Sequence, residues 1–597
     1  MPVQRYSVNQ YPIETLLTWI KTDEIAIPEI QRPFVWNAAK VRDFIDSLYN
    51  GYPVGYLIAW RNHDVRLKDG TQSAGKRILI DGQQRVTALL AALLGEQVVT
   101  KAYKRTRVSI AFHPGEERFE VTNAAIRRDR GWIADISTMF SSDVKILQIL
   151  DQYCNANPAA DRDKSYECLE KLRGITSNHL GLIELNSDLE VETVAEIFVR
   201  INRQGVTLNA ADFAMSKMAA TEQHNGHLLR KCIDYFCHLA VAPEAYSNLA
   251  NDGDFASTEY FRTLEWLKHE KDDLYDPSYT DMLRVAFTSR FKRGSLEDLV
   301  ALLSGRNFET RVFEEATAQK SFETLENGIL SYMNETNFKR FTMILRSAGF
   351  VDSSLIRSHN TVNFAYILYL TLREQQEAPH RIERLVRRWF VMSILTGRYT
   401  GSPETAFGVD IGNIDSQGAA AYLDTIERGE LSSAFWDVGL PQQMDSSVAS
   451  SPYVNVYLAS QIRAQDKGFL SRDITVRDLI EGQLHIHHVF PRNYLRQHGL
   501  QRRRYNQIAN YVVMQPEINI AIGDNAPSAY FSELWHQCNN GQTRYGGITD
   551  ADELKDNLGS HCIPGGMDSA TAGDYDRFLI ERRRLMAGKM HDYYVAL

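Results

Sequence analysis

The hydrophobic pattern of this chain changes in character near residue 221, and that change constrains the fold more than any other feature. Before it, short runs rich in β-branched residues, such as 54–60 and 77–80, alternate with helix-like segments. After it, apolar residues recur at three- and four-residue spacing, as in 361–372 and 382–395. A chain of 597 residues is also too long for a single hydrophobic core. We therefore predict an α+β, predominantly helical protein with an α/β N-terminal domain and a helical middle domain.

Two polar stretches are candidate boundaries between domains. Residues 396–417 are rich in Gly, Ser, Thr and Asp, and residues 440–452 contain two prolines among Gln and Ser. Beyond the second stretch we expect a helical start, a histidine cluster, a Gly-rich loop over 539–573 and a final helix over 575–594. The predicted domains are residues 1–222, 223–440 and 441–597.

Charge and cysteine content limit the function classes. Lys and Arg number 66 against 75 Asp and Glu, which gives a net charge of −9. This balance argues against a uniformly basic nucleic-acid coat, but it permits local basic patches. The six cysteines form no C-x-x-C pair, which favours a reducing compartment. The N-terminus lacks the apolar core of a signal peptide, and no apolar run approaches the ~20 residues that span a bilayer. We therefore expect a cytoplasmic protein with no membrane partner.

The most specific chemical pattern is the segment Leu-His-Ile-His-His-Val-Phe-Pro at residues 484–491. Successive side chains of a strand point to opposite faces, so His487 and His488 would face different surroundings. One histidine can then hold a divalent metal while its neighbour acts as a base on the attacking water of a phosphodiester hydrolase. The alternative for tandem histidines is a satisfied structural interface.

The downstream residues give this segment a family resemblance. A His-His pair three residues before a proline, with later asparagines at 510 and 519, resembles the ββα-metal or HNH nuclease motif. The resemblance implies that His488 is the general base and that Asn510 pins the loop between the two strands and positions the base. It also implies that His487 and Asn519 bind the metal, Mg²⁺ or Mn²⁺.

Polar residues around this motif are candidate DNA contacts. His485 shares a strand face with His487 and is either an extra metal ligand or a phosphate donor. Arg502 and Arg503 lie between the two halves of the motif, where they either meet DNA phosphates or form a solvated helix end.

A strand, a tight turn and a helix follow one another over residues 77–94. The turn is the segment Asp-Gly-Gln-Gln-Arg at 81–85, and an Ala- and Leu-rich helix continues from it. A helix N-terminus presents free N–H groups and partial positive charge, which Arg85 supplements. The pattern predicts an anion-binding corner in which Gly82 allows close backbone approach and Asp81 caps the helix or acts on metal or water. The alternative is a purely structural turn.

Two further blocks accompany this turn: Ile-Pro-Glu-Ile-Gln-Arg-Pro-Phe-Val-Trp at 27–36, and the segment 197–213 with its Arg-Ile-Asn-Arg-Gln-Gly core. The three blocks together resemble the N-terminal domain of the GmrSD family, which is related to the ParB/sulfiredoxin nucleotide-binding fold. The resemblance implies an NTP, such as GTP or ATP, bound by this domain. The implied nucleotide contacts are Gln31, Arg32, Asp81, Gly82, Gln83, Gln84, Arg85, Asn202 and Arg203. Gln31 and Arg32 are alternatively DNA contacts.

Two basic segments of the N-terminal part are candidate phosphate-tracking surfaces. Residues 101–107 interleave basic residues with an aromatic one and include Lys104 and Arg105, and residues 127–130 contain three arginines. The alternative for each segment is a solvated surface.

The two resemblances together imply a single-chain GmrSD-type, type IV restriction endonuclease. Such a protein would be an NTP-regulated, divalent-metal-dependent nuclease with NTPase activity that cleaves modified double-stranded phage DNA. Residues 1–222 would bind nucleotide and sense DNA, and residues 441–597 would cut it. A homodimer is a candidate assembly. The alternative function is a nucleotide-responsive DNA-binding regulator or adaptor whose HNH half is inactive.

Overall fold

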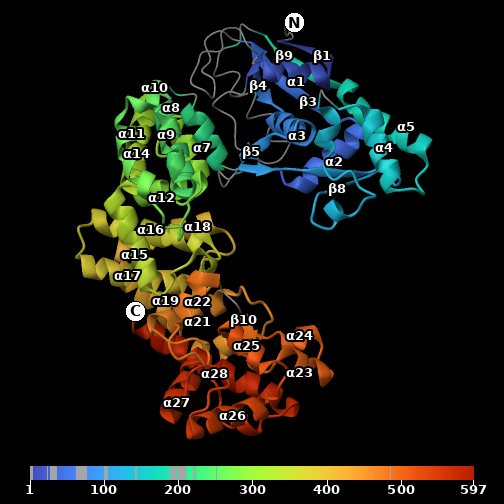
Figure 1. Ribbon diagram of the computed structural model, residues 1–597. Helices are drawn as coiled ribbons and strands as arrows, with labels where there is room; N and C mark the ends of the chain where they lie inside the picture. Colours follow the sequence, from blue (N-terminus) through green and yellow to red (C-terminus); the bar gives the residue numbers. More distant parts are fainter. Residues whose placement is uncertain are drawn as a thin grey trace. The chain divides into compact units, whose positions relative to one another are not determined.

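The computed structural model describes residues 5–22, 24–26, 36–61, 77–99, 105–141, 144–186, 189, 197, 210–219, 221, 224–250, 252–483 and 486–597. The chain forms two compact units. The first consists of Met1–Glu270 and Val300–Phe322, and the second consists of Lys271–Leu299 and Glu323–Leu597 (Figure 1). Gln31, Arg32, Lys104, Asn202, Arg203 and His485 lie outside the described residues. The division into three domains at 222 and 440 stays a prediction.

The first unit is built on a mixed five-stranded sheet with the strand order β1-β9-β3-β4-β2. β9 pairs antiparallel with β1 and parallel with β3, and β4 pairs antiparallel with β3 and parallel with β2. The strands span Tyr6–Pro12 (β1), Ile25–Ala26 (β2), Tyr56–Arg61 (β3), Arg77–Asp81 (β4) and His179–Leu185 (β9). The predicted strand at 77–80 is confirmed.

Three helices build the core of this unit against the sheet: α1 (Ile13–Lys21), α2 (Ala38–Tyr49) and α3 (Gln83–Leu93). Each presents apolar residues at helical spacing, for example Val41, Ile45 and Leu48 of α2, which are almost fully buried. α2 begins where the Asn37 side chain accepts the Lys40 N–H at 2.8 Å, so a side chain satisfies one otherwise unpaired donor. This cap and the buried apolar stripe explain why the helix begins at Ala38.

Small hairpins and helices complete the first unit. β5 (Gln97–Val99) pairs with β6 (Arg105–Arg107), and β7 (Ile110–His113) pairs with β8 (Arg118–Val121). The helices are η1 (Ile126–Arg128), η2 (Ile136–Phe140), α4 (Ile146–Ala156), α5 (Arg162–Arg173), η3 (Gly174–Ser177), α7 (Ala210–Ala219), α8 (Gly226–Val241), η4 (Pro243–Ala245), α9 (Tyr246–Leu249), α10 (Gly253–Ala256), α11 (Glu259–Thr263) and η5 (Glu265–His269).

The second unit is helical apart from one short hairpin, β10 (Ile486–His488) with β11 (Tyr511–Val513), within the part of the chain that is described. The chain passes between the units after Glu270, within α13 (Leu296–Leu303) and within α14 (Glu315–Met333). The other helices are α12 (Tyr279–Phe291), α15 (Glu335–Ser347), η6 (Ser353–Leu355), α16 (His359–Glu374), α17 (Pro379–Leu395), α18 (Pro403–Gln417), α19 (Ala419–Glu430), η7 (Phe435–Gly439), α20 (Leu440–Gln443), α21 (Pro452–Arg463), α22 (Val476–Gln483), α23 (Arg492–Gln497), α24 (Arg502–Tyr505), η8 (Ile508–Asn510), α25 (Pro516–Ile522), α26 (Pro527–Asn540), α27 (Ala551–Ser560), η9 (Met567–Ser569), η10 (Ala572–Asp574) and α28 (Tyr575–Val595). The predicted α+β, mainly helical class is confirmed.

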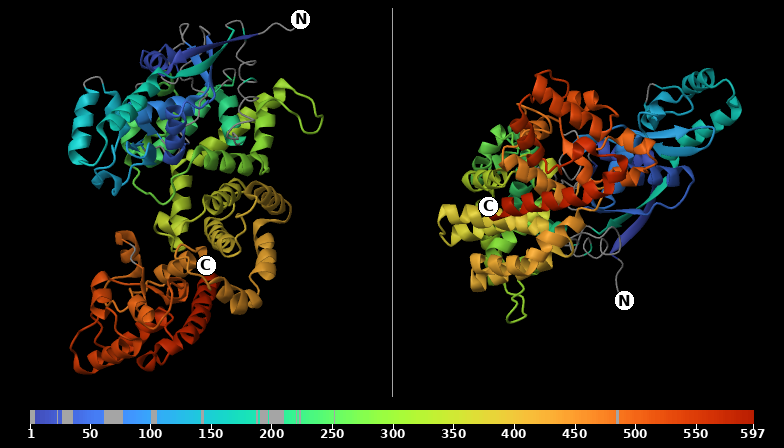
Figure 2. Two further views of the ribbon diagram at one scale, coloured as in Figure 1. Left: turned by 90° about the vertical axis from the view of Figure 1, so that its right-hand side faces the viewer. Right: turned by 90° about the horizontal axis from the view of Figure 1, so that it is seen from below.

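Two segments expected to be irregular contain helices. α18 occupies most of the polar stretch 396–417, since Pro403 begins it and Phe407, Ile411 and Ile414 form a buried stripe at helical spacing. α27 lies inside the expected loop 539–573 and begins where the Asp550 side chain accepts two backbone N–H groups. The loop predicted over 539–573 was therefore wrong for residues 551–560, and most of the predicted break at 396–417 is helical. The final helix predicted over 575–594 is confirmed as α28. It runs beside other elements of the C-terminal part (Figure 2).

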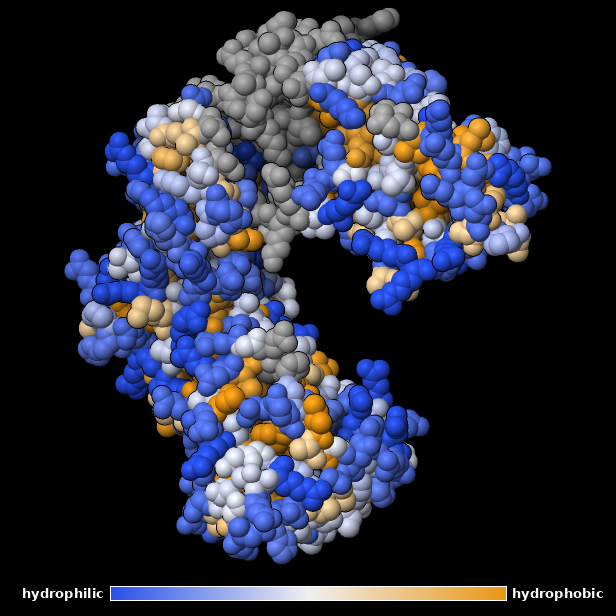
Figure 3. Space-filling view, in the orientation of Figure 1, coloured by the Kyte–Doolittle hydropathy of each residue, from blue (hydrophilic) through white to orange (hydrophobic). Residues whose placement is uncertain are grey.

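The surface of both units is mainly hydrophilic on the face shown in Figure 3, with hydrophobic residues in small separate areas. All six cysteines are free. Among the described residues, no helix is both long and apolar enough to cross a membrane.

Candidate functional site

The histidine pair lies on β10, which forms a hairpin with β11, and the helix α25 follows β11. β10 pairs antiparallel with β11 in a register that sets His487 opposite Val512 and His488 opposite Tyr511. α25 begins three residues after β11 and carries Asn519. Since neighbouring strand residues face opposite sides, His487 and His488 point in different directions. Figure 1 labels β10 and α25 in this region.

His488 is held by an amide from the loop between the two strands. Its Nε2 lies 2.9 Å from Oδ1 of Asn506, and its ring packs edge-on against Tyr511 at 5.4 Å. An amide oxygen can only accept, so Nε2 carries the proton and the lone pair is on Nδ1. Burial is the main cause that lowers the pKa of His488, and the nearby cation of Arg492 adds to it. The imidazole is therefore neutral at pH 7, as a general base must be.

Asn510 is fully buried and fastens the loop around His488. Its Oδ1 accepts the Phe490 N–H at 2.8 Å, and its Nδ2 donates to the carbonyls of Phe490 and Tyr505, each at 3.1 Å. Its own carbonyl accepts the Val489 N–H at 2.9 Å. The residue after Tyr505 is Asn506, so Asn510 holds in place the backbone that carries the partner of His488.

Asn506 is the site residue that the sequence did not reveal. It follows the arginines of α24 in a polar loop, and no spacing in the motif singles it out. Its contact with His488 spans 18 residues and depends on the loop conformation that Asn510 fixes.

A buried arginine supports the same loop from the last helix. Arg582 of α28 is 0% exposed; its Nη1 donates to the Ala509 carbonyl at 2.9 Å, and its Nε and Nη2 donate to the His561 carbonyl at 3.2 and 3.1 Å. The triple arginine at 582–584 would be expected to form a surface cluster, and this expectation is wrong for Arg582. Backbone carbonyls take the place of water around its guanidinium.

His561 beside this arginine is a buried neutral histidine. Gln461 donates to its Nδ1 at 3.2 Å, and its Nε2 donates to the Lys467 carbonyl at 2.8 Å. Burial, assisted by the charges of Arg582 and Lys589, lowers its pKa to about 3. In the unfolded chain this histidine becomes protonated as the pH falls below about 6.5, whereas in the folded chain it stays neutral. Protonation therefore favours the unfolded state, and folding stability falls as the pH drops below 6.5.

This linkage gives a pH prediction. From pH 7 to pH 5, His561 should lower the free energy of unfolding by about 2 kcal/mol. In His561→Gln this contribution should disappear, because glutamine has no proton to gain. Urea unfolding of both proteins at the two pH values measures it, and equal pH dependence in parent and variant would contradict the assignment.

The candidate metal donors are His487 and Asn519, both half-buried. An imidazole nitrogen and an amide oxygen can bind a divalent cation, and they would leave most coordination positions to water and phosphate oxygens. Across the described ranges, no group of three His, Cys, Asp or Glu side chains is arranged to hold a metal. A cation held by these two donors alone would be loosely bound by protein.

Exposed arginines lie beside this site. α24 lies in the loop between β10 and β11, with the side chains of Arg502 and Arg503 exposed. Neither forms an ion pair within the described chain, whereas Arg504 contacts both carboxylate oxygens of Asp576, at 2.6 and 2.8 Å. Two of the three charges are thus available to an anion. Arg105 lies in β6, opposite Val99.

The N-terminal corner also has the predicted order of strand, turn and helix. Gly82 is the N-cap residue of α3 with φ +100°, and a Cβ there would lie 2.3 Å from a methyl group of Leu57. Its close approach is therefore to β3, where the register with β4 shifts between Ile58 and Ala59. No side chain caps α3, so Asp81 does not have the capping role considered for it.

Arg85 is partly engaged by the backbone of the preceding turn. Its Nε donates to the Val54 carbonyl at 2.9 Å and its Nη1 to the Tyr56 carbonyl at 3.3 Å, with Asp81 at 3.6 Å. A Cβ on Gly55 would lie 2.9 Å from Nη2 of Arg85. Arg85 thus fixes the Val54–Tyr56 turn, and about a quarter of its side chain remains exposed.

The two glutamines of the corner are 93% buried, each with 7% exposure. Gln84 Oε1 accepts the Trp36 N–H at 3.3 Å, which brings the end of the 27–36 block to the turn. Gln83 Oε1 is buried with no hydrogen-bond partner among the described residues. An unsatisfied buried oxygen is costly, so a ligand group that donates a hydrogen bond to it would be stabilised.

The comparison with protein families matches this part of the chain. Residues 13–219, about a third of the sequence, match the family model of the GmrSD restriction endonuclease N-terminal domain. A comparison with curated proteins finds no match. The matched range contains β3, β4, α3 and the glutamines of the corner. Over residues 13–219 the chain is therefore similar to the N-terminal domain of GmrSD restriction endonucleases.

Proposed function

We propose that this protein is a divalent-metal-dependent DNA endonuclease, regulated by a nucleotide, that cleaves modified foreign DNA in the manner of type IV restriction. The observation that carries the proposal is a neutral histidine on a β-hairpin, held at Nε2 by Asn506 and followed by a helix that carries Asn519. The N-terminal family match supports a role in restriction and DNA as the partner.

The proposal gives separate tasks to the residues of the hairpin. Nδ1 of His488 takes a proton from the attacking water, while Asn506 keeps the ring in the required tautomer and orientation. His487 and Asn519 would hold the divalent cation, which when bound stabilises the charge that develops on the phosphate and the leaving oxygen. Arg502 and Arg503 would contact neighbouring phosphates and position the strand. Asn510 and Arg582 keep the loop rigid.

The donor set leads to a prediction about the metal. Because it combines an imidazole with an amide and includes no carboxylate, Mn²⁺ should support cleavage at a lower concentration than Mg²⁺, by about tenfold, and EDTA should abolish cleavage. The assay is cleavage of plasmid and phage DNA over a series of metal concentrations, on unmodified, phosphorothioated and glucosylated hydroxymethylcytosine DNA, with and without NTP. Cleavage that survives EDTA would contradict the proposal.

A second function is favoured by the same donor set. The two proposed donors include no carboxylate, and no group of three metal-binding side chains occurs among the described residues. Weak metal binding would suit a nucleotide-responsive DNA-binding regulator with an inactive HNH half. Binding of modified DNA with no cleavage in Mg²⁺, Mn²⁺, Ni²⁺ or Zn²⁺ would support this function over the nuclease.

Nucleotide binding is proposed for the corner at the start of α3. Gln83→Met keeps the side-chain length and removes the buried oxygen, so it should weaken NTP binding by about tenfold, the cost of one lost hydrogen bond in a buried site. Calorimetry with GTP and ATP measures the change, and Gln97→Met, an exposed glutamine of β5, is the control. Unchanged affinity in Gln83→Met would remove the corner from the proposal.

A further inference from the structure

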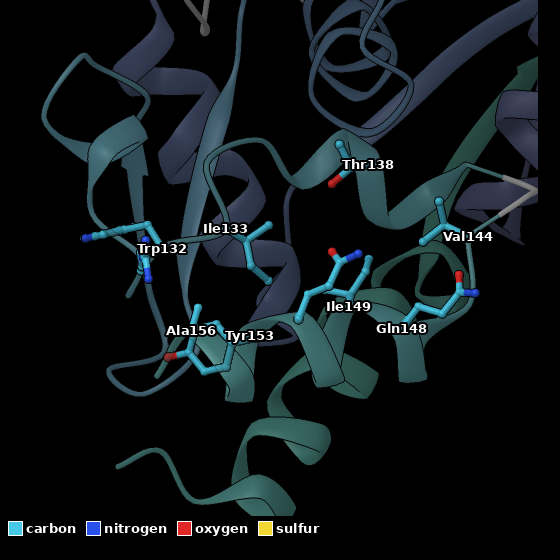
Figure 4. Close-up of a pocket in the computed structure, with 10 residues that line it drawn as sticks. Trp132, Ile133, Thr138, Val144, Gln148, Ile149, Tyr153 and Ala156 are labelled. Carbon is cyan, nitrogen blue, oxygen red and sulfur yellow. The ribbon is translucent and has the colours of Figure 1, made fainter. Parts of the chain in front are cut away.

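A pocket of about 510 Å³ lies in the first unit between α4 and the segment that leads into η2. Figure 4 shows its side chains around an open space, with Thr138 across the pocket from Tyr153 and Ile149. The volume falls in the range of small-molecule binding pockets. The lining residues are aromatic (Trp132, Tyr153), aliphatic (Ile133, Val144, Ile149, Ala156), polar (Thr138, Gln148, Gln152) and cationic (Arg130).

The aromatic walls are already fixed. The Trp132 ring packs edge-on against His113 at 5.1 Å, and the Arg118 guanidinium lies 5.2 Å from its centre. Next to it, Ile133 forms two backbone hydrogen bonds with Phe112, of 2.8 and 3.0 Å. Tyr153 is buried, and burial raises its pKa, so its ring is a neutral phenol. A flat ligand can therefore stack on these rings with little loss of side-chain entropy.

Polar groups with free hydrogen-bonding capacity face the same space. Gln148 and Gln152 lie one turn apart on α4, are exposed, and form no side-chain hydrogen bond within the described chain. The Thr138 hydroxyl donates to the Asp135 carbonyl at 2.8 Å, which leaves its oxygen free to accept. Two amides and a hydroxyl can both donate and accept hydrogen bonds, so they can pair with the donors and acceptors on the edge of a nucleobase or on a sugar.

The rim of the pocket is positively charged. Arg130 lines it, Arg127 and Arg128 of η1 precede it in the chain, and none of the three forms an ion pair with any described residue. Two neighbouring carboxylates are already neutralised: Asp135 lies 2.9 Å from Arg107, and Asp151 lies 2.6 Å from Arg162. A third, Asp129, accepts the Gly131 N–H at 2.9 Å, so one carboxylate stands against the three arginines. Uncompensated arginines beside a pocket attract a ligand that carries phosphates.

We propose that this pocket receives a base flipped out of duplex DNA and that Gln148, Gln152 and Thr138 recognise its modification. The inference rests on the proposed function. Aromatic walls stack the base, the arginines hold the flanking phosphates, and the volume exceeds that of a bare pyrimidine, which leaves room for a substituent. Enzymes that do chemistry on a base bring it out of the stack in this way.

The test uses the full-length protein in EDTA and duplexes that differ at one cytosine. That position carries cytosine, 5-hydroxymethylcytosine or its glucosylated form, with 2-aminopurine beside it to report unstacking. The parent should bind one modified duplex more tightly and raise its fluorescence. Gln148→Ala with Gln152→Ala should reduce this preference at least tenfold and leave binding of the unmodified duplex unchanged. Gln152→Trp, which fills the pocket, should do the same.

Asn155→Ala is the matched control, since Asn155 is an exposed amide on the same helix that does not line the pocket. If both pocket variants keep the preference of the parent, the pocket assignment is overturned while the proposed function stands. If the parent neither prefers nor cleaves any modified duplex, the proposed function itself fails. Calorimetry with free deoxycytidine monophosphate and GTP forms the last arm. If the pocket variants lose binding of these free nucleotides but keep the parent's preference for modified duplexes, the pocket is a free-nucleotide site and the proposal is overturned.

Discussion

His488→Ala should lower the rate of DNA cleavage by at least about 100-fold, the usual contribution of a positioned general base. The reason is local: His488 is neutral because it is buried, and Asn506 directs its basic Nδ1 away from the loop. DNA binding should be unchanged, because phosphate contacts rather than His488 hold the substrate. Cleavage of modified plasmid DNA in Mn²⁺ and band shifts in EDTA measure the two quantities separately.

His536→Ala is the matched control for this variant. His536 is an exposed histidine on α26 in the same unit, with no hydrogen bond to any described residue. It should cleave at the parent rate. If His488→Ala cleaves as fast as His536→Ala, the assignment of the base is wrong. If the parent and both variants bind modified DNA but the parent cleaves it with none of the metals, the protein is a DNA-binding regulator and not a nuclease.

The local sequence pattern was enough to predict those parts of the fold whose conformation depends mainly on neighbouring residues in the sequence. The strand, turn and helix over 77–94 follow from an apolar run, a glycine and an Ala- and Leu-rich stretch, and the structure contains them in that order. Composition was misleading at α18, where Gly, Ser and Thr suggested a break. The stripe of Phe407, Ile411 and Ile414 was the signal that could have revealed the helix.

The candidate site was predictable where the motif has fixed spacing and not where tertiary contacts complete it. The positions of His487 and His488 on a strand follow from alternation, and Asn510 from the motif. Asn506 could not be chosen from several polar residues in its loop, because its role depends on how that loop folds. The burial of Arg582 was equally hidden, since a long cation is expected at the surface unless distant carbonyls surround it.

Arg582→Met should destabilise the C-terminal part of the second unit by about 3 kcal/mol. The methionine fills much of the same space, but the buried carbonyls of Ala509 and His561 lose their donors, and each buried polar group left unsatisfied costs roughly 1–3 kcal/mol. Arg584→Met is the control, because Arg584 is exposed on the same helix and a surface change of this kind stays within about 0.5 kcal/mol.

Hydrogen exchange gives the most direct measurement, because it reports local unfolding in a chain of two units. In Arg582→Met, backbone amides of residues 486–513 should exchange faster, including the Val489 N–H that donates to the Asn510 carbonyl. Arg584→Met should leave them unchanged. Cleavage should fall in Arg582→Met as well, since the loop that carries Asn506 loses one of its supports. Equal exchange in the two variants would show that Arg582 does not fasten this loop.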